Sequence, residues 1–426
     1  MTIEEFMKYA TDDHFTNIQI NELTSNQVEA SYIDDKLENN DASYTITYSI
    51  KAEKNGKTVK ISTDYLEKSI IDFLNRKVEN EDSKYEDDYL EDTTNNNSID
   101  VNKVEIQEQL DMLKDVYKKK EKYTNIKSIT SEFYGRSKKE RIVNSNGVDM
   151  STTNEVYGFY CEVIVEEDGK IISHDKSALK TNKNDIDVNK LADAAIEEAE
   201  IMINKKELST GKFDIVLSNE VAGSVIANMM SGIYANNIRE KISIYVDKKD
   251  KKIANNKITI MEDPKNKDYP GNELFDNDGI QTTKKCIVKD GVLQTYLYNI
   301  KEAKLAGVES TGNSFSGIGT RNMYVAPGEL SEEEIFKKMK NGLYITGYMG
   351  SSSTAINIST GSISLQIFGF IIEDGEKKCG FEPCVMTTTF DELLNNVEEV
   401  GNNLEFFSNA SASPALYIKN ISVAGK

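Results

Sequence analysis

The chain has 426 residues, which is enough for two or three domains, each with its own apolar core. Its 71 acidic and 51 basic residues give a formal net charge of −20, which repels nucleic-acid phosphates and anionic membrane surfaces, so neither is an expected partner. No segment approaches the roughly 20 apolar residues of a membrane helix, and the first residues lack the features of a signal peptide. The four cysteines form no C-x-x-C pair. We therefore expect a soluble cytoplasmic protein with reduced thiols.

The beginning of the chain predicts a helix, a β-hairpin and a second helix. Apolar residues at helical spacing indicate the first helix over residues 3–10. From residue 42 onward apolar and polar side chains alternate, which predicts a strand with one face formed by Tyr44, Ile46, Tyr48 and Ile50. Asn55-Gly56 favours a tight turn, so residues 58–62 can return as the second strand. The next helix has one apolar stripe, formed by Leu66, Ile70, Phe73 and Leu74.

A polar and acidic stretch over residues 79–100 interrupts the N-terminal half and indicates an exposed connector. After it we expect a helix over 106–117, strands over 141–147, 157–165 and 170–173, and a helix over 187–204. The short Ser/Thr/Gly stretch at 208–211 indicates a boundary. We therefore predict an N-terminal α/β domain over residues 1–207 and a second domain over residues 208–426.

The C-terminal half is richer in strand. The candidate strands are residues 213–217, 242–246, 256–261, 284–289, 292–298, 343–347, 362–372 and 418–424. Two helices have S/T-x-x-E capping boxes, Ser331 with Glu334 and Thr389 with Glu392, and Asn341-Gly342 can end the first of them. These elements predict a two-domain α+β protein, with an N-terminal antiparallel sheet and helices followed by a strand-rich domain.

Few residues indicate an independent catalytic or cofactor site. His14 and His174 are the only histidines, and no ligand set lies near either in the sequence, so we interpret both as exposed surface residues. A Ser-His or Cys-His nucleophile pair lacks a visible third member. The glycine-rich segment 312–319 has no Walker lysine, and Phe275–Gly279 lacks the first and closing acidic ligands of a calcium loop. We expect a packed or flexible loop at the first and a turn at the second.

Residues 216–229 indicate the end of a strand followed by a helix with a capped start. Ser218 or Asn219 can cap the helix, and Glu220 in its first turn complements the helix dipole by roughly 0.3 to 1 kcal/mol. An apolar face predicts packing on the domain, through Val221, Ala222, Val225, Ile226 and Met229. On these grounds alone Glu220 needs no catalytic role.

The string Asn219-Glu-Val-Ala-Gly-Ser224 resembles the place where the TldD branch of the TldD/PmbA family carries its H-E-x-x-x-H zinc motif. Further blocks resemble the family in the family's order, namely residues 275–283, 288–293, 296–299, 304–307, 310–313, 341–346, 369–375, 400–404 and 421–425. Together they span residues 216–426. The first half resembles the family more loosely, chiefly through Val143-Asn-Ser-Asn-Gly147.

The resemblance implies a two-domain protein from a family whose TldD members are zinc peptidases that act on peptides or unfolded proteins. Such members are often paired with a PmbA subunit, also called TldE, that lacks the metal ligands. This chain is similar to the second kind, because Asn219 and Ser224 stand at both histidine positions while Glu220 and Gly223 remain. The segment Ser408–Ser413 also lacks the cysteine ligand of the catalytic branch.

These substitutions imply that the chain has no catalytic residue, metal or cofactor of its own, and that zinc belongs only to a TldD-like partner. Residues five apart on a regular helix lie about 140 degrees apart, so two ligands at that spacing need a local distortion, which Gly223 is expected to retain. We interpret Glu220 as a relic or a structural acid.

The leading hypothesis is therefore a PmbA/TldE-like subunit of a TldD/PmbA-type peptidase system. It would bind peptide or unfolded protein, along an exposed strand edge, and support a zinc-carrying partner. One alternative is a homodimeric peptide-binding protein without a catalytic partner. Another is a metal-independent hydrolase, for which the sequence shows no base. Neither nucleic acid nor membrane is an expected partner.

Overall fold

The computed structural model describes residues 1–81, 103–123 and 125–426. Most of the predicted acidic connector over residues 79–100 lies outside the described residues, and its first two residues belong to a helix. No helix among the described residues is both long and apolar enough to cross a membrane.

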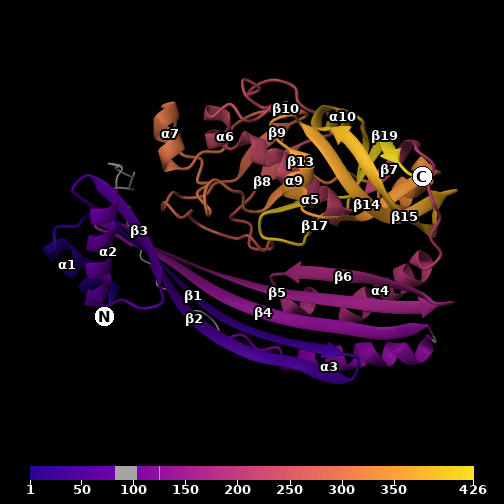
Figure 1. Cartoon of the computed structure of the whole chain (residues 1–426), viewed down its shortest axis with the longest axis horizontal. Helices are drawn as coiled ribbons and strands as arrows, with labels where there is room; N and C mark the ends of the chain where they lie inside the picture. Colours follow the sequence, from indigo (N-terminus) through magenta and orange to yellow (C-terminus); the bar gives the residue numbers. More distant parts are fainter. Residues whose placement is uncertain (82–102, 124) are drawn as a thin grey trace.

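One long antiparallel sheet forms the N-terminal half, with the strand order β3-β2-β1-β4-β5-β6. The strands are β1 (Thr16–Ile33), β2 (Lys36–Lys54), β3 (Lys57–Thr63), β4 (Ile126–Asn144), β5 (Asp149–Glu167) and β6 (Lys170–Lys180). Four of them have 18 or 19 residues, about three times the usual length. Figure 1 shows them running along one side of the molecule, with the C-terminal half packed above them.

Helices cover the two ends of this sheet and make two separate cores. Helices α1 (Ile3–Asp12) and α2 (Lys68–Asn80) pack on one end around Phe6, Ile50 and Leu74. Helices α3 (Gln107–Lys118) and α4 (Val188–Met202) pack on the other end around Phe133 and Phe159. Two short 3-10 segments, η1 (Lys119–Lys122) and η2 (Lys183–Asp185), lie near this second core.

The predicted hairpin is confirmed, since Asn55 and Gly56 have φ values of 58° and 70°, the left-handed pair of a tight hairpin turn. The face of β2 formed by Tyr44, Ile46, Tyr48 and Ile50 is covered only near Ile50, where the helices pack, and Tyr44 is 60% exposed. One detail is wrong: Phe73, predicted on the apolar stripe of the helix, is 43% exposed, because α2 buries only a narrow stripe of its surface.

The C-terminal half contains two sheets. The first has the order β12-β7-β19-β15-β14-β13, with β16 paired to β19, and a further β12–β14 pairing closes five of its strands into a ring. Its strands are β7 (Gly211–Leu217), β12 (Gly342–Met349), β13 (Ile356–Asn357), β14 (Ser362–Glu373), β15 (Glu376–Thr389), β16 (Val397–Val400) and β19 (Leu416–Ala424).

The second sheet has the order β10-β9-β8-β11-β18-β17. Its strands are β8 (Ile260–Glu262), β9 (Lys285–Lys289), β10 (Val292–Leu293), β11 (Met323–Val325), β17 (Glu405–Phe406) and β18 (Ser411–Ser413). The helical segments of this half are α5 (Asn219–Met230), η3 (Ser231–Ile233), α6 (Ala235–Arg239), α7 (Ile300–Ala306), α8 (Glu332–Met339), α9 (Ser352–Ala355) and α10 (Phe390–Asn395).

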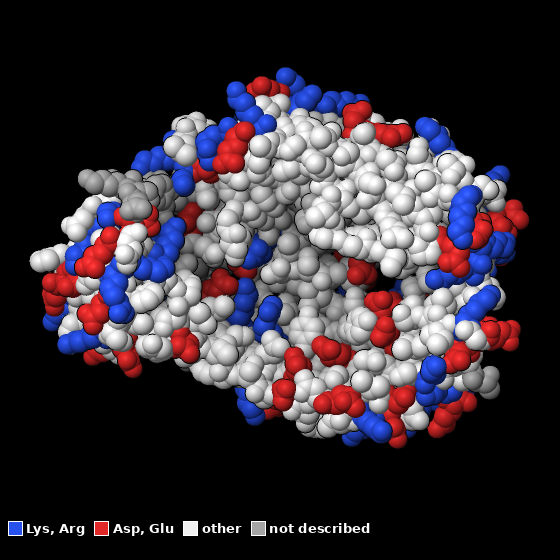
Figure 2. All heavy atoms as spheres, viewed as in Figure 1, with Lys and Arg blue, Asp and Glu red and all other residues white. Residues whose placement is uncertain are grey.

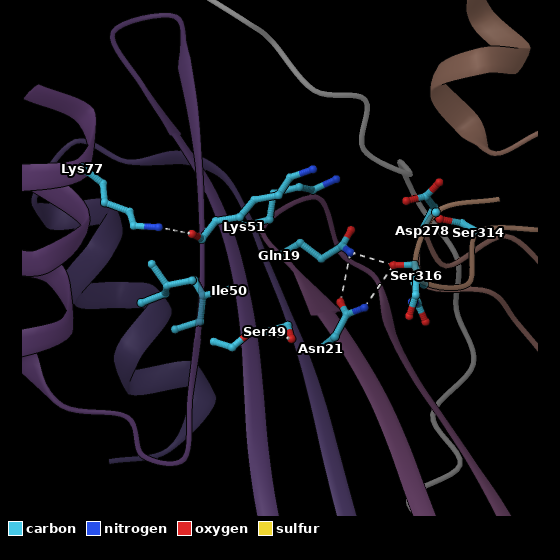
Figure 3. Close-up of a pocket in the computed structure, with 14 residues that line it drawn as sticks. Gln19, Asn21, Ser49, Ile50, Lys51, Lys77, Asp278, Ser314 and Ser316 are labelled. Atoms are coloured by element: carbon cyan, nitrogen blue, oxygen red, sulfur yellow. Dashed lines mark hydrogen bonds between the residues drawn. The ribbon is translucent and has the colours of Figure 1, made fainter. Parts of the chain in front are cut away.

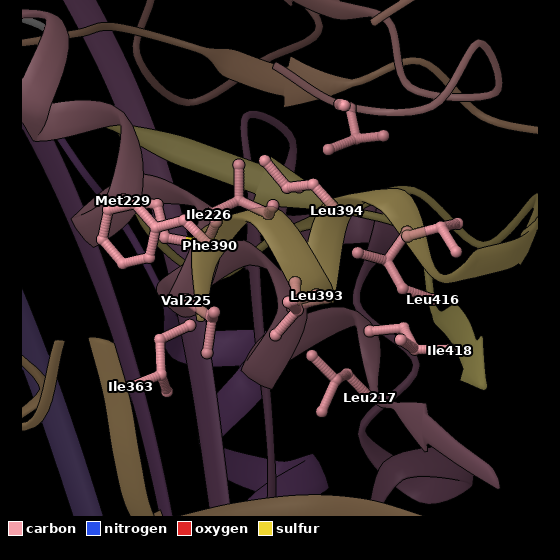
Figure 4. Close-up of a cluster of buried hydrophobic side chains, with 14 of the residues drawn as sticks. Leu217, Val225, Ile226, Met229, Ile363, Phe390, Leu393, Leu394, Leu416 and Ile418 are labelled. Atoms are coloured by element: carbon pink, nitrogen blue, oxygen red, sulfur yellow. The ribbon is translucent and has the colours of Figure 1, made fainter. Parts of the chain in front are cut away.

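Helix α5 contributes to the apolar core that these two sheets share. Figure 4 shows Val225, Ile226 and Met229 beside side chains of α10 and of the first sheet. Residues of the second sheet, such as Ile260 and Met323, belong to the same core. Ser218 caps the helix, because its hydroxyl accepts a hydrogen bond from the Val221 N–H at 3.3 Å. The predicted amphipathic helix is therefore confirmed, and Ser218, not Asn219, is its cap.

Four predictions in this half are wrong, and the first is the strand over residues 256–261, which is reduced to β8 (Ile260–Glu262). Residues 242–246 form turns, although Tyr245 is buried in the core. The predicted strand 292–298 is reduced to Val292–Leu293. Asn341-Gly342 does not end α8; Lys340 takes the left-handed φ of 66° instead, and Gly342 begins β12. Both predicted N-caps are present, with Ser331 in a full capping box and the Thr389 hydroxyl accepting from the Glu392 N–H.

A buried ion cluster joins the two halves. Glu273 is 1% exposed and accepts from Lys138 of β4 and from Arg321, each at 2.9 Å. The Asn154 amide donates to two backbone carbonyls of the same loop, and Phe275 packs on the apolar cluster around Ile142. The predicted turn at 275–279 therefore helps to dock the C-terminal half onto the long sheet.

Candidate functional site

A cavity of about 770 Å³ lies between the two halves of the chain. Strand β6 and helix α4 form one wall, and helix α5 and strand β12 form the opposite wall. The segment 403–407 also contributes. Figure 2 shows that the surface is hollowed between the halves, with acidic and basic side chains at the edges of the hollow. The residues that resemble the zinc-motif positions of the TldD branch line this cavity.

Asn219, Glu220 and Ser224 all line the cavity. The Asn219 side chain donates to the carbonyl of Asn403 at 3.3 Å and accepts from the Glu220 N–H at 2.9 Å. The Ser224 hydroxyl lies 2.7 Å from the hydroxyl of Tyr348. Asn219 and Ser224 are therefore neutral polar side chains that bond to the cavity wall.

Gly223 lies on the side of α5 that packs against β18. A Cβ atom at this position would lie 3.3 Å from both the Ala412 Cα and the Ser413 N. Helix α5 runs without a break through this residue, so the expected local distortion is wrong. The glycine instead permits a close approach between α5 and the backbone of β18.

Three charged groups and one histidine meet at one wall of the cavity. The Glu198 carboxylate of α4 lies 2.6 Å from His174 Nε2, 2.7 Å from Lys176 Nζ and 2.9 Å from Lys377 Nζ. Burial alone would raise the pKa of Glu198, but the hydrogen bond from His174 and the two lysine charges hold that pKa well below its usual range. His174 is 7% exposed and lies inside β6, so the prediction of an exposed residue is wrong, whereas His14 is exposed as predicted.

Two other acids in the cavity, Glu220 and Glu332, have pKa values that are raised and not lowered. Glu220 is accessible to solvent inside the cavity, yet the surrounding walls raise its pKa, repulsion from Asp175 adds to the effect, and Lys176 opposes it. Burial also raises the pKa of Glu332, which accepts a hydrogen bond from the Tyr344 hydroxyl at 2.7 Å. Both carboxyls can therefore take up a proton more readily than an acid in water.

The residues of the motif do not suit zinc. Asn219 and Ser224 offer an amide and a hydroxyl where imidazole nitrogens would be needed, and the nearest histidine is held by Glu198. Within the described residues, no three His, Cys, Asp or Glu side chains lie where they could share one metal ion.

The sequence did not indicate the charged wall of this cavity. Glu198 and Lys377 are 179 positions apart, and no local pattern joins them. One local signal was the run His174-Asp175-Lys176 within a strand. His174 and Lys176 lie on the same face of that strand, and if this face is buried, both side chains need polar or charged partners. Glu332, Tyr344 and Tyr348 were also missed, because the fold alone brings them to α5.

Comparisons with known proteins agree with this architecture. Residues 210–425 match the PmbA/TldA metallopeptidase C-terminal domain, and residues 99–203 match the central domain of the same family. Metalloprotease PmbA of Escherichia coli O157:H7 is 29% identical over 224 residues, which cover 53% of this chain and 48% of that protein. The match thus spans about half the length of that relative. A metalloprotease from Methanocaldococcus jannaschii is 23% identical over 82% of this chain and 76% of its own length.

Two solved structures share the fold along nearly the whole chain. A proposed modulator of a DNA gyrase from Thermotoga maritima MSB8 has a TM-score of 0.88 and 25% identity, and the match covers 99% of this chain and 100% of that one. TldE from Thermococcus kodakarensis has a TM-score of 0.87 and 18% identity, with the same coverage, which shows the shared fold. The predicted family and α+β fold are both confirmed, and the chain belongs to the TldD/PmbA family of metallopeptidase-related proteins.

Proposed function

We propose that this protein is a PmbA/TldE-like subunit that binds peptide in the cavity beside α5 and supports a zinc-carrying TldD-like partner. The observation that carries the proposal is the position of Asn219 and Ser224. They occupy both histidine positions of the family's motif, face the cavity, and bond to its walls. The neighbouring segment Ser408–Ser413 supplies no thiolate. The chain itself then performs no zinc-dependent cleavage.

The cavity suits an extended peptide. Its β6 wall is the outermost strand of the long sheet, and residues 173–177 of that strand line the cavity. An outer strand presents N–H and C=O groups with which a peptide backbone can pair. The Thr346 hydroxyl, in the opposite wall, is buried and has no hydrogen-bond partner among the described residues. A bound backbone would satisfy it.

The other expected properties follow from this role. Zinc is a cofactor of the partner alone, and the substrate is a peptide or an unfolded protein undergoing cleavage or maturation. The four cysteines are unpaired, and three of them are buried, which suits the reducing cytoplasm. The excess of acidic residues disfavours nucleic acid as a ligand, whatever the gyrase-related name of the relative from Thermotoga suggests.

Purification from the native host tests the partner. We expect a stable complex with a second chain that carries H-E-x-x-x-H, zinc in that complex, and chelator-sensitive peptide cleavage by the complex only. A homodimer that retains peptide and has no such partner would favour the alternative of an independent peptide-binding protein. Stoichiometric zinc and chelator-sensitive cleavage by this chain alone would overturn the proposal.

Matched variants test the cavity. Ser224→Ala and Thr346→Val remove one hydroxyl each with little change of shape, so both should weaken the binding of an unstructured fluorescent peptide. Thr47→Val is the control, because Thr47 is exposed on the long sheet and lies outside the cavity. Equal affinities in all three variants would exclude this cavity as the peptide site. Ser224→Ala also tests the metal-independent hydrolase, which would lose its cleavage activity with that hydroxyl.

A further inference from the structure

Two carboxylates on opposite walls of the cavity beside α5 have no partner among the described residues. Asp175 belongs to β6 and Glu220 to the first turn of α5, and both line the cavity. Both side chains are exposed to solvent. Neither carboxylate forms a hydrogen bond or an ion pair with another residue that the structure describes. These two acids are therefore open to a ligand that enters the cavity.

The lysines of the cavity do not neutralise this pair. The charge of Lys176 opposes the raised pKa of Glu220, but its Nζ lies 2.7 Å from the Glu198 carboxylate and forms an ion pair there. Lys190, on α4, also lines the cavity, yet it makes no contribution to the pKa of Glu220. The cavity therefore keeps an excess of negative charge between its two walls.

Repulsion between acids makes this arrangement costly. Glu162 on β5 lies directly opposite Asp175 on β6, and like charges in such a pair destabilise a sheet. Across the cavity, burial by the walls raises the pKa of Glu220, and the charge of Asp175 adds to this effect. Glu405 acts in the same direction, although it pairs with Lys180 at 2.7 Å. A positive group between the walls would reduce this repulsion.

The chemistry of the pair suits an organic cation better than a metal ion. Ca²⁺ and Mg²⁺ take about six or more oxygen ligands, and no three acidic, histidine or cysteine side chains of the described residues could share one ion. An ammonium or guanidinium group needs only acceptors on the sides that it faces. Carboxylates on two walls of a cavity of about 770 Å³ provide such acceptors and leave room for the chain that carries the group.

A second cavity, of about 500 Å³, lacks this arrangement. It lies where β1, β2 and β3 meet two loops of the C-terminal half, and its lining includes three lysines and a single acid, Asp278. Figure 3 shows Asp278 on the loop side, with Lys51 and Lys77 on the side of the strands and of α2. A cationic group thus finds two acids in the cavity beside α5 and only one here.

We propose that Asp175 and Glu220 hold a cationic group of the bound peptide between them, an ammonium or a guanidinium. This inference rests on the proposed function, because it takes the cavity beside α5 as the peptide site. It names the part of the peptide that the site selects, which is a free amino terminus or a basic side chain. Asp175 lies among residues 173–177 of the outermost strand, so the charged contact and the backbone pairing would occur side by side.

Fluorescence anisotropy with the full-length chain tests the selection. The probe is an unstructured Gly/Ser peptide with a neutral label at its carboxyl end. It is used in three forms: with a free amino terminus, with an acetylated amino terminus, and acetylated with one internal lysine. At least one cationic form should bind about tenfold more tightly than the neutral form, roughly the effect of two partly exposed ion pairs. The form that binds tightly identifies the source of the cation.

Matched variants assign the selection to the two acids. In Asp175→Asn/Glu220→Gln the preference for the cationic peptide should fall from about tenfold to near one, because both ion pairs are lost. Asp72→Asn/Glu79→Gln is the control, since both residues are exposed on α2, lie outside the cavity and give the same change of net charge. This control should keep the preference of the wild type.

Two results would overturn the inference and leave the proposed function standing. They are equal affinities of the wild-type chain for all three peptides, and an equal preference in the cavity and control variants. In both cases the peptide still binds. Absence of binding by all three peptides would remove the proposed peptide site and this inference together, so the two failures are distinguishable.

Discussion

His174 Nε2 lies 2.6 Å from Glu198 Oε2, and this bond joins the outermost strand of the long sheet to the helix packed on it. Lys377, from the C-terminal half, reaches the other oxygen of the same carboxylate at 2.9 Å. One buried acid thus connects three elements around the cavity that holds the family's motif.

The substitution Glu198→Gln should destabilise the protein by about 3 kcal/mol, because it leaves the neighbouring lysines without their counter-charge in a buried position. Urea unfolding measures this change. Glu197→Gln is the matched control: Glu197 is the preceding residue and is exposed, so its change should stay within about 0.5 kcal/mol. Similar losses in the two variants would contradict the assigned role of Glu198.

The stability of the protein should also fall in acid. The pKa of Glu198 is lower in the folded state than its ordinary value of 4.5, so the unfolded chain takes up the proton first. The contribution is then fully present above that value and is lost as the pH falls toward the folded pKa. The difference in unfolding free energy between wild type and Glu198→Gln should therefore shrink between pH 6 and pH 3 (about the range set by these pKa values). A constant difference over this range would refute the assignment.

Gly223→Ala should lower the stability by about 1 kcal/mol, although alanine favours helix over glycine by a similar amount. The added Cβ lies 3.3 Å from the backbone of β18, which cannot turn aside as a side chain can. Thermal unfolding checks the prediction. Adding Ala412→Gly should give no rescue, because the close atoms are the Ala412 Cα and the Ser413 N. A Gly223→Ala variant more stable than wild type would show that β18 moves away.

Lys340→Gly should stabilise the protein by about 1 kcal/mol, because Lys340 ends α8 with a φ of 66°, a conformation that glycine adopts without strain. The control is Lys337→Gly inside the same helix, where glycine should cost about 1 kcal/mol. Chemical denaturation of both variants tests the pair, and opposite signs are expected. Destabilisation by both would mean that the Lys340 side chain, not its backbone, sets the stability there.

Local structure was predictable from the sequence where the residues of a short segment determine its conformation. Asn55-Gly56 fixes a hairpin turn, and Ser331 with Glu334 fixes a helix start. Strand β1 (Thr16–Ile33) was missed because its middle residues are only partly buried and therefore show no apolar alternation. Its neighbours β2 and β4 define it as a strand, through pairings that the local pattern does not contain.

The same limit applies to the candidate site. Residues 219–224 could be placed on a capped helix and matched to a family motif, since both signals are local. The bond between Ser224 and Tyr348 joins residues 124 positions apart, and Lys377 on β15 reaches Glu198 on α4 across 179 positions. Pairings at such separations result from the fold. Neither the periodicity nor the composition of the sequence predicts them.

The ion cluster at Glu273 has a consequence for how ligands reach the cavity between the halves. Glu273 is almost fully buried and is neutralised from both halves of the chain, by Lys138 and by Arg321. Separating the halves would break the ion pair between Glu273 and Lys138, while Arg321 would stay with Glu273 in the C-terminal half. We therefore expect the two halves to keep a fixed arrangement and not to open and close around a ligand. For the peptide ligand proposed above, a fixed cavity between the halves would favour extended segments over folded ones.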